Sequence, residues 1–495
     1  MTTSSCHPTE VAGQEHSKGA IRRCNSDSKM IQALGRKTET ANHGYLLTNP
    51  VKLRNLLGNL MVVAVGDKPK TRTGTPACLL SARQFLWLFA FFCVPAFAQT
   101  NEELFREYQF DFDVPGARAN GMGGTFIGTA DDATASYANP AGLAFLSETA
   151  LTLEWRQRHV EGLRGESSGL FNTLYDQAPV DLNSINFFSF NFRWRGWYFG
   201  LFQFDYLDEE QERIFQSRSM GTFEQRTESR NVALDLEGRT RGFGVARRFG
   251  NFKLGFSANY LELTGKTSYR RESFILNDEG TTFNLFTSQI DDSDQAWGYN
   301  LGIHHNASKR FSWGAVWRHN PKFSLDEDVL ESVNGQPLFV DLVPVPFSVP
   351  DVLGVGILYR AKPELRLSLD WQRVFYSEII DKGFVIVESI ATERKENYSI
   401  EDADEIHLGI EWLIPRDSSV WALRAGYFNN PQHPVTYRGE DLIIGARFDG
   451  AGSRDQNHFT LGVGWVLLNK VEVDVAANFW EQGREYTVSF IWRKK

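Results

Sequence analysis

Hydrophobic and polar residues alternate one by one along much of this chain, and its last part shows the pattern most clearly. Apolar residues occupy every second position in 471–479, and most of the residues between them are polar. The same period of two recurs in 485–492 and, earlier, in 458–465 and 365–372. Successive side chains of a β-strand point to opposite faces, so each segment is expected to be a strand with one apolar face.

Fourteen such segments follow residue 148, and no apolar run there approaches the length of a membrane-spanning helix. The predicted strands are 149–158, 184–194, 196–208, 231–249, 252–263, 296–305, 310–319, 351–360, 364–376, 404–414, 419–428, 456–467, 470–480 and 484–493. The links between them alternate between short and long ones. The long links are 159–183, 209–230, 264–295, 320–350, 377–403 and 429–455.

This sorting of the links is typical of an outer-membrane barrel. Such barrels place short turns on the periplasmic side and long loops outside, and their closure leaves no unpaired strand edge in lipid. Tryptophans near the strand ends fit the aromatic girdles of such a barrel: Trp297, Trp313, Trp371, Trp412, Trp465 and Trp492. We therefore predict an all-β membrane protein, a fourteen-stranded antiparallel transmembrane β-barrel over 149–495. A soluble barrel or a propeller with buried rings is the alternative fold.

The first hundred residues have a different character. Residues 85–98 form an apolar run that follows basic residues and ends in an A-x-A site, Ala96 to Ala98. These features predict a secretory signal peptide over 61–98, because a membrane anchor would need about 20 apolar residues. Residues 1–60 lack a sustained apolar period, and we interpret them as a non-native N-terminal extension, with translation starting at Met61 or later.

Composition narrows the possible functions. The four cysteines all lie in the first hundred residues, so the rest of the chain has no disulfide framework, zinc cluster or cysteine nucleophile. Of the 52 Lys and Arg residues 12 fall in 1–98, against 5 of the 61 Asp and Glu residues. The main body is therefore acidic, which argues against a nucleic-acid partner, since phosphates attract positive charge.

A glycine-rich segment, 99–148, precedes the first strand and is expected to be an N-terminal hatch in the lumen. Its glycines allow close backbone approach, Asp131 or Asp132 can cap a short helix, and Asn139-Pro140 can end that helix and begin another turn. The candidate hatch residues are Gly121, Gly123, Gly124, Asp131, Asp132, Asn139 and Pro140. Inward glycines of the strands would let the hatch lie close to the wall: Gly255, Gly302, Gly356, Gly409 and Gly462. No Gly-Lys-Ser/Thr follows the glycines, so a nucleotide site is not predicted.

Several motifs resemble one known family. They are Gly116-Ala117-Arg118, Gly121-Met122-Gly123-Gly124, Ala130-Asp131-Asp132-Ala133, Asn139-Pro140-Ala141-Gly142-Leu143, Pro350 to Gly356, Arg424 to Tyr427 and Leu461 to Gly464. Together they are similar to the outer-membrane transport proteins related to the fatty-acid transporter FadL and the toluene-uptake protein TodX. The Ala-Asp-Asp-Ala and Asn-Pro-Ala-Gly-Leu elements also occur in PorV-like proteins of secretion systems.

The resemblance implies a fourteen-stranded barrel, a hatch that plugs its lumen, and passive uptake of hydrophobic small molecules such as long-chain fatty acids or aromatic hydrocarbons. The implied partners are that ligand, outer-membrane lipid and lipopolysaccharide, and the barrel-assembly machinery during biogenesis. The alternative is a PorV-like, partner-binding barrel of a secretion system.

Aromatic residues at two kinds of position are the candidate ligand contacts. In the third predicted strand, Phe202, Phe204 and Tyr206 have the opposite parity to Trp197 and Phe199. Either these rings line an apolar lumen, or a bulge near Gly200 to Gln203 returns them to the outer face and opens a lateral exit. Apolar residues in the third and fourth long loops form the second group, represented by Phe283, Phe286, Phe339 and Phe347.

No catalytic set is evident in the sequence. His304, His407 and His458 fall on separate strands at inward positions, which suits histidines that are solvated or bonded to the hatch. An outer-membrane hydrolase would need a Ser, His and acid set, which we do not find. We predict a protein that is not an enzyme and uses no cofactor or metal.

Overall fold

The computed structural model describes residues 114–167, 172–220, 224–278, 280–383, 395–440 and 455–494. The chain divides into two units, Met1–Phe85 and Leu86–Lys495, and every described residue belongs to the second. The predicted extension, the predicted signal peptide and residues 99–113 of the predicted hatch lie outside the described residues.

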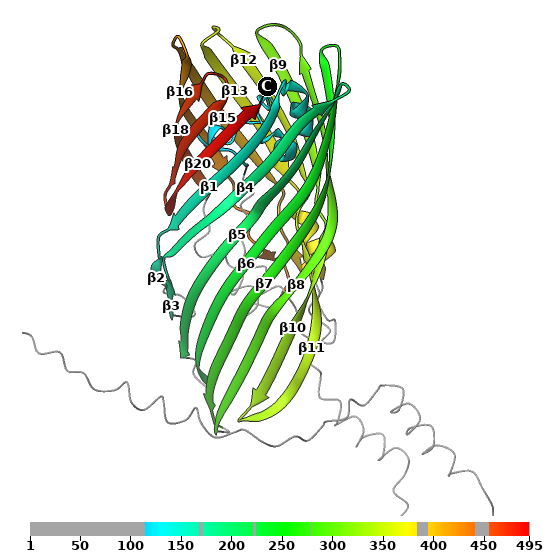
Figure 1. Cartoon of the computed structure of the whole chain (residues 1–495). Helices are drawn as coiled ribbons and strands as arrows, with labels where there is room; N and C mark the ends of the chain where they lie inside the picture. Colours follow the sequence, from blue (N-terminus) through cyan, green and yellow to red (C-terminus); the bar gives the residue numbers. More distant parts are fainter. Residues whose placement is uncertain are drawn as a thin grey trace, which may run out of the picture. The chain divides into compact units, whose positions relative to one another are not determined.

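The wall of the second unit is a closed barrel of fourteen antiparallel strands (Figure 1). These are β1 (Thr149–Val160), β4 (Val180–Trp194), β5 (Trp197–Met220), β6 (Glu224–Phe249), β7 (Phe252–Asn277), β8 (Gly280–Asn306), β9 (Phe311–His319), β12 (Val352–Arg360), β13 (Leu365–Val374), β15 (Ala403–Pro415), β16 (Ser419–Asn430), β18 (Gln456–Leu467), β19 (Val471–Trp480) and β20 (Gly483–Lys494). Each strand pairs with the next, and β1 closes the ring by pairing with β20 from Thr149↔Lys494 to Val160↔Gly483. The predicted fold class is confirmed.

The strands are longer than predicted on the side of the long links. The links 209–230 and 264–295 were expected to be loops, but their described residues 209–220, 224–230, 264–277 and 280–295 continue β5 to β8 as paired strands. The link 320–350 is largely the hairpin of β10 (Lys322–Val333) and β11 (Gln336–Ser348). The first link contains β2 (Arg164–Ser167) and β3 (Asn172–Gln177). These loop predictions were wrong because charged residues replace apolar ones there, while the backbone ladder continues. A cross-strand ion pair of Lys266 in the third link with Asp235, at 3.9 Å, lies along this continued ladder.

The described residues of the last two long links form short elements. These are a π-helix η2 (Ile379–Gly383), a 3-10 helix η3 (Lys395–Asn397), and the two-residue strands β14 (Tyr398–Ser399) and β17 (Thr436–Tyr437), which pair with each other. Parts of the same links, 384–394 and 441–454, lie outside the described residues.

The two faces of the wall differ in burial as the alternation predicts. Apolar side chains on one face stay exposed, for example Leu201 at 49% and Leu461 at 60%, which suits a surface in contact with lipid. Their neighbours along the strand are buried inside the barrel. The predicted girdle residues Trp297, Trp412 and Trp492 are among the exposed ones.

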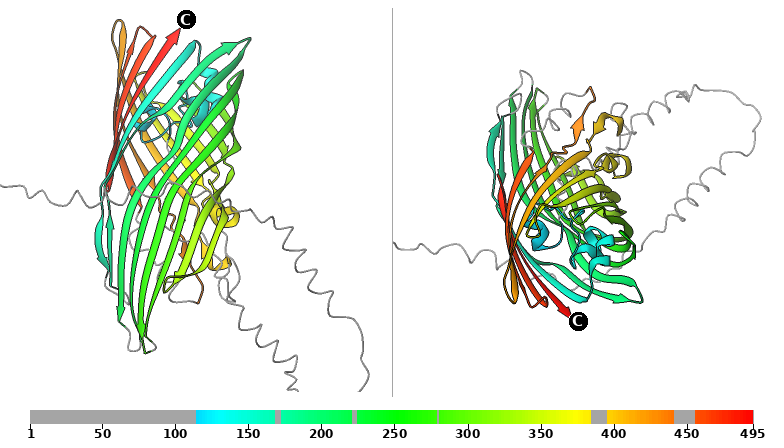
Figure 2. Two further views of the ribbon diagram at one scale, coloured as in Figure 1. Left: turned by 60° about the horizontal axis from the view of Figure 1, so that its bottom comes forward. Right: turned by 90° about the horizontal axis from the view of Figure 1, so that it is seen from above.

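Residues 114–146 lie inside the ring of strands (Figure 2), and we call them the hatch segment after the role expected from the sequence. It consists of α4 (Ala117–Asn120), α5 (Ala135–Ala138) and η1 (Pro140–Phe145) joined by turns. The Asn139 side chain accepts the Ala141 N–H at the start of η1, and Pro140 occupies the first turn, where its missing N–H is not needed. Gly123 and Gly124 have φ of 66° and 75°, a backbone region that strains any residue with a Cβ.

Candidate ligand site in the barrel lumen

A large group of buried apolar side chains fills the lumen between the hatch segment and the long hairpins, by which we mean β5–β6, β7–β8 and β10–β11. We call it the luminal apolar cluster. Its members are Tyr137, Phe187, Phe202, Phe204, Tyr206, Leu207, Leu234, Leu236, Leu261, Leu263, Ile290, Phe323, Leu325, Phe347, Val349, Val352, Val374, Tyr376, Ile379, Ile380, Tyr398, Ile400, Ala403 and Val435. They come from the wall, the outer hairpin β10–β11, the last links and the hatch segment, so residues far apart in sequence form one apolar surface.

Aromatic rings form the part of the cluster that touches the hatch segment. Tyr137 of α5 lies with its ring centroid 4.7 Å from that of Phe204 and 5.9 Å from that of Phe202. Phe187 of β4 packs against Phe204 at 6.1 Å. Phe204 is fully buried and Tyr206 is 2% exposed, whereas their lipid-facing neighbour Leu201 is 49% exposed. The rings at 202, 204 and 206 therefore line the lumen, the first of the two arrangements expected from the sequence.

The ladder of β5 is interrupted, but further along than the stretch Gly200 to Gln203. Pairing with β6 shifts by one residue between Asp205 and Leu207, so that Tyr206 is the extra residue of a bulge. On the other side, pairing with β4 ends at Phe187↔Phe204 and the described residues 178–186 form no further ladder with β5. Backbone contact resumes at Ala178, whose N–H donates to the Glu212 carbonyl oxygen at 3.0 Å, and at Arg213, where β3 pairs with β5. The wall beside the luminal apolar cluster thus has a gap in its ladder, which we call the β4–β5 interruption.

The other predicted ligand contacts lie in different places. Phe347 belongs to the luminal apolar cluster. Phe283 and Phe286 are half-buried on the outer part of β8, where Phe283 packs against Phe274 at 4.8 Å and Phe286 against Tyr269 at 5.7 Å. The side chain of Phe339 lies outside what the structure describes. Sequence reasoning missed most of the cluster, because Leu236, Leu263 and Phe323 lie on separate strands whose alignment only the barrel sets.

All five glycines singled out on the strands contact the hatch segment. A Cβ built on Gly409 would lie 2.7 Å from the Met122 carbonyl oxygen, and one on Gly462 would lie 3.1 Å from the Gly121 Cα. Gly255 and Gly302 face Pro140, Ala141 and Asn139, and Gly356 faces the Gly128 backbone. The absence of side chains at these positions lets the hatch backbone lie directly on the wall.

Arg118 of α4 joins the hatch segment to the wall by charge. Its guanidinium donates to both oxygens of Glu411 at 3.0 and 3.3 Å, and to Asp131 and Asp132 at 2.5 and 3.3 Å. Arg424 of β16 donates to the same Glu411 at 2.9 Å and to Asp474 at 2.6 Å. A buried cation that loses such partners is left with a large desolvation cost, so this network fixes the hatch segment.

The two hatch carboxyls beside Arg118 respond to it differently. Burial alone would raise the pKa of Asp131, but the charges of Arg118 and Arg366 hold this pKa below its ordinary value. For Asp132 burial dominates and raises the pKa, although Arg118 and the Thr134 hydroxyl oppose it. Asp131 is the carboxyl whose oxygen lies nearer to the Arg118 guanidinium. Asp132 also accepts the Thr134 N–H at 2.9 Å and shapes the turn before α5.

Two of the three inward histidines bond to the hatch segment. His304 contacts the Gly128 carbonyl oxygen at 3.1 Å, and His407 contacts that of Gly123 at 2.7 Å. His458 contacts the Asn478 side chain at 3.1 Å. His304 and His407 therefore support the hatch backbone, whereas His458 bonds within the wall. Among the described residues, no group of three or more His, Cys, Asp or Glu is placed to hold a metal ion.

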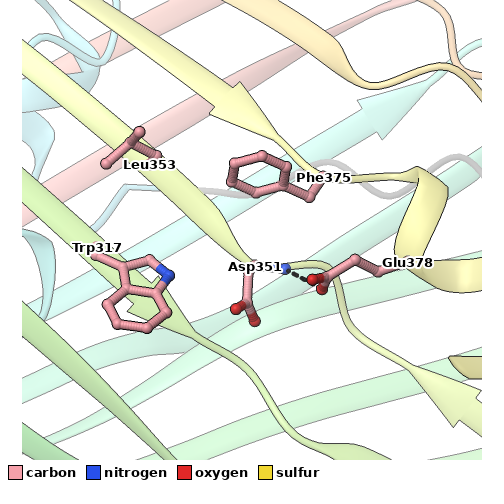
Figure 3. A pocket seen from close by; sticks show the side chains of 5 residues that line it. All are labelled: Trp317, Asp351, Leu353, Phe375 and Glu378. Atoms are coloured by element: carbon pink, nitrogen blue, oxygen red, sulfur yellow. Dashed lines mark hydrogen bonds between the residues drawn. The ribbon is translucent and has the colours of Figure 1, made fainter.

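A hollow of about 370 Å³ lies elsewhere, on the lipid side of the wall (Figure 3). Trp317, Leu353, Phe375, Asp351 and Glu378 line it. Leu353 is 37% exposed, while the preceding residue, Val352, is buried in the luminal apolar cluster. The hollow is therefore separated from the lumen by the wall. No helix in the described part of the chain is long and apolar enough to cross a membrane.

Comparison with known families matches residues 250–487 to outer membrane protein transport protein (OMPP1/FadL/TodX). No curated protein matches the chain. Two solved structures share the fold. The toluene transporter TodX of P. putida is 14% identical with a TM-score of 0.52, covering 78% of this chain and 99% of its own. A FadL homologue of Pseudomonas aeruginosa is 12% identical with a TM-score of 0.54, covering 77% of this chain and 99% of its own.

These matches agree with the closed barrel, the exposed apolar outer face and the motifs that the sequence shares with this family. The family consists of outer-membrane transport proteins and not of enzymes. The resemblance stated from the sequence is confirmed: residues 250–487, slightly less than half of the chain, match the OMPP1/FadL/TodX family of outer-membrane transport proteins.

Proposed function

We propose that this protein is an outer-membrane channel for the passive uptake of hydrophobic small molecules, such as long-chain fatty acids or aromatic hydrocarbons. The observation that carries the proposal is the luminal apolar cluster, which places the rings of Phe187, Phe202 and Phe204 inside a wall that already faces lipid on its outside. Apolar side chains on the inner face of a barrel favour an oily passenger over a polar one. A barrel that only binds a protein partner has no need of this surface.

The long hairpins are proposed as the first docking site. Phe274 and Leu276 on β7 are each 49% exposed, and Leu338 and Val340 on β11 are 51% and 70% exposed. β10 pairs both with β11 and with the outer part of β8, so these hairpins adjoin each other. Exposed apolar surface of this kind usually marks a binding site.

The hatch segment is proposed to block the straight path through the lumen, and the β4–β5 interruption to provide a lateral exit. The hatch is held by Arg118 and by backbone contacts with the strand glycines, which favours a plug that stays in place during uptake. The interruption begins at Phe204, which is itself part of the luminal apolar cluster. A ligand in the cluster would thus reach lipid without crossing the charged hatch.

Uptake of a fluorescent fatty acid and of toluene into proteoliposomes would test the channel. A double variant, Ser184→Cys with Leu207→Cys, places thiols at positions that would face each other if the ladder at Phe187↔Phe204 continued. We expect uptake to fall several-fold when the disulfide forms and to recover when it is reduced. Normal uptake by the oxidised variant would contradict the lateral exit. Absence of uptake of either compound by the unmodified protein would contradict the channel itself.

A further inference from the structure

The rim of the barrel that carries the short turns is strongly basic. Each of the six short turns at this rim has at least one exposed cation in it or directly beside it, and another lies at the end of β20. The ten exposed cations are Arg193, Arg195, Arg247, Arg248, Lys309, Arg310, Lys362, Arg416, Lys470 and Lys494. The acidic residues of these turns and of the start of β1 are only Glu148, Glu364 and Asp417. Within the described part of the chain, none of these ten cations forms an ion pair.

The opposite end of the barrel has the reverse charge. The outer parts of β5 to β8 and β10, taken as residues 205–241, 260–295 and 322–333, contain 20 Asp and Glu against 10 Lys and Arg. Many of these outer cations are neutralised, as in the pairs of Arg239 with Asp205 and Arg241 with Glu262. An excess of unpaired positive charge is therefore specific to the short-turn rim.

The rim cations lie next to the edge of the apolar outer face. Trp194, Trp197 and Phe249 are exposed at 57%, 39% and 52% at the short-turn ends of β4, β5 and β6. Arg195 lies over the Trp194 ring at 4.8 Å, and Arg247 lies over the rings of Trp197 and Phe249 at 4.7 and 5.5 Å. Aromatic side chains of this kind mark the level of the lipid headgroups. The guanidinium groups are thus held at the height of lipid phosphates.

A guanidinium stacked on a ring keeps its N–H edge available, and that edge matches the oxygens of a phosphate. The ring below it offers apolar contact to the glycerol and upper acyl chain of the same lipid. A soluble anion would gain only the first of these contacts. Since outer-membrane barrels keep their short turns on the periplasmic side, the lipid concerned is a phospholipid of the inner leaflet.

We propose that this rim is a binding ring for anionic phospholipid headgroups, and that it anchors the periplasmic end of the barrel in the inner leaflet. The cations and rings at the β4–β5 and β6–β7 turns, from Arg195 to Trp197 and from Arg247 to Phe249, form its best-defined site. The proposal does not depend on which molecule the barrel transports.

The test uses the full chain reconstituted in bilayers, with tryptophan fluorescence quenched by brominated phosphatidylglycerol or by brominated phosphatidylcholine. Wild-type protein should prefer the anionic lipid by roughly fivefold at low salt, and the preference should shrink as salt screens the charges. The variant R195Q/R247Q/K309Q/K362Q should bind the two lipids about equally. The control variant, Lys266→Gln with Lys322→Gln, removes two cations from the outer end and should keep the wild-type preference.

Three results would overturn the proposal: equal quenching by both lipids in wild-type protein, a preference that survives in the quadruple variant, or a preference lost in the control variant. Soluble glycerol phosphate at millimolar concentration separates the two sources of phosphate. It should leave the lipid preference unchanged, and its displacement of the anionic lipid would show a free-anion site in place of a lipid site. Heat-modified electrophoretic mobility checks that each variant contains a folded barrel.

Discussion

The two halves of the barrel lumen are built from opposite chemistry. The half that holds the hatch segment is polar, with Arg118, Glu411, Arg424 and Asp474 joined in one buried network. The other half holds the luminal apolar cluster, with its rings and aliphatic side chains from wall, hairpins and links. Both halves share one wall, and the same strands pass from one to the other.

The two halves suit two different tasks: the polar half holds the hatch segment in place, and the apolar half is suited to the proposed passage of ligand. Buried ion pairs are directional and costly to break, so the polar half fixes one position of the hatch. Apolar contacts are non-directional and scale with area, so the apolar half can accept oily molecules of different shapes. The β4–β5 interruption lies at the boundary, where Tyr137 of the hatch segment meets Phe202 and Phe204. Under the proposed function, a ligand would therefore leave from the apolar half without disturbing the polar one.

Removing the central cation of the polar half should have the largest effect. Arg118→Ala removes the cation that joins Glu411 to Asp131 and Asp132, and Arg366 alone would remain shared by Glu411 and Asp131. The expected cost to the docked hatch is about 3 kcal/mol, the lower end for a broken buried ion pair. We expect faster hydrogen exchange across 114–146 and larger single-channel conductance, while the barrel stays folded. Arg226→Gln, at the outer end of β6, is the control and should leave both measurements unchanged. Wild-type exchange in Arg118→Ala would show that the network does not hold the hatch.

A polar substitution in the apolar half should weaken ligand binding and leave the hatch in place. Phe204→Ser removes a fully buried ring, a loss of about 1.5–3 kcal/mol or roughly 10- to 100-fold in the affinity for a fluorescent fatty acid. Phe243→Ser is the matched control, because that ring is 43% exposed on the lipid side. If the two variants bound the fatty acid with equal affinity, the ligand site would lie outside this cluster.

The sequence predicts those parts of this division that depend on local patterns, and it misses those that depend on contacts between residues far apart in the chain. Alternation places Gly409 and Gly462 on the inner face and Leu461 on the outer face, because the period of two is local. The pairing of Arg118 with Glu411 spans 293 residues and depends on the barrel closing. The outer parts of β5 to β8 were also missed, since charged strands in water lack the apolar signal that identifies a strand.

Adding bulk between the hatch and the wall should have a moderate effect. In Gly409→Val, the Cβ would meet the Thr125 Oγ1 at 2.5 Å and the Met122 carbonyl oxygen at 2.7 Å. The expected cost is about 1–3 kcal/mol, seen as increased conductance through a displaced hatch. Ala425→Val on the neighbouring β16 adds the same methyl groups on the lipid side and should conduct like wild type. If Gly409→Val barrels showed wild-type conductance, the hatch would not rest on this strand.

Lowering the pH should release the hatch. We expect this to be the smallest of these effects. The pKa of Asp131 is held below its ordinary value by Arg118, so its stabilisation of the hatch is present above that ordinary value, about 3.9. It is lost as the pH falls through the lowered pKa. Wild-type conductance should therefore stay constant from pH 7 to about pH 4 and rise below it. Asp131→Asn should cost about 1 kcal/mol at pH 7 and show a weaker rise in acid. A wild-type rise that begins near pH 6 would point to a different titrating group.

Photoaffinity labelling tests the central claim most directly. A long-chain acid and an alkylbenzene, each carrying a diazirine, are bound to the full-length protein in bilayers, photolysed, and mapped by mass spectrometry. The account predicts that labels concentrate on inward residues of the luminal apolar cluster, such as Phe204, Leu236 and Leu263, and are absent from the strands around Glu411. Labels confined to lipid-facing residues such as Leu201 and Leu461, or found on the hatch network, would contradict it.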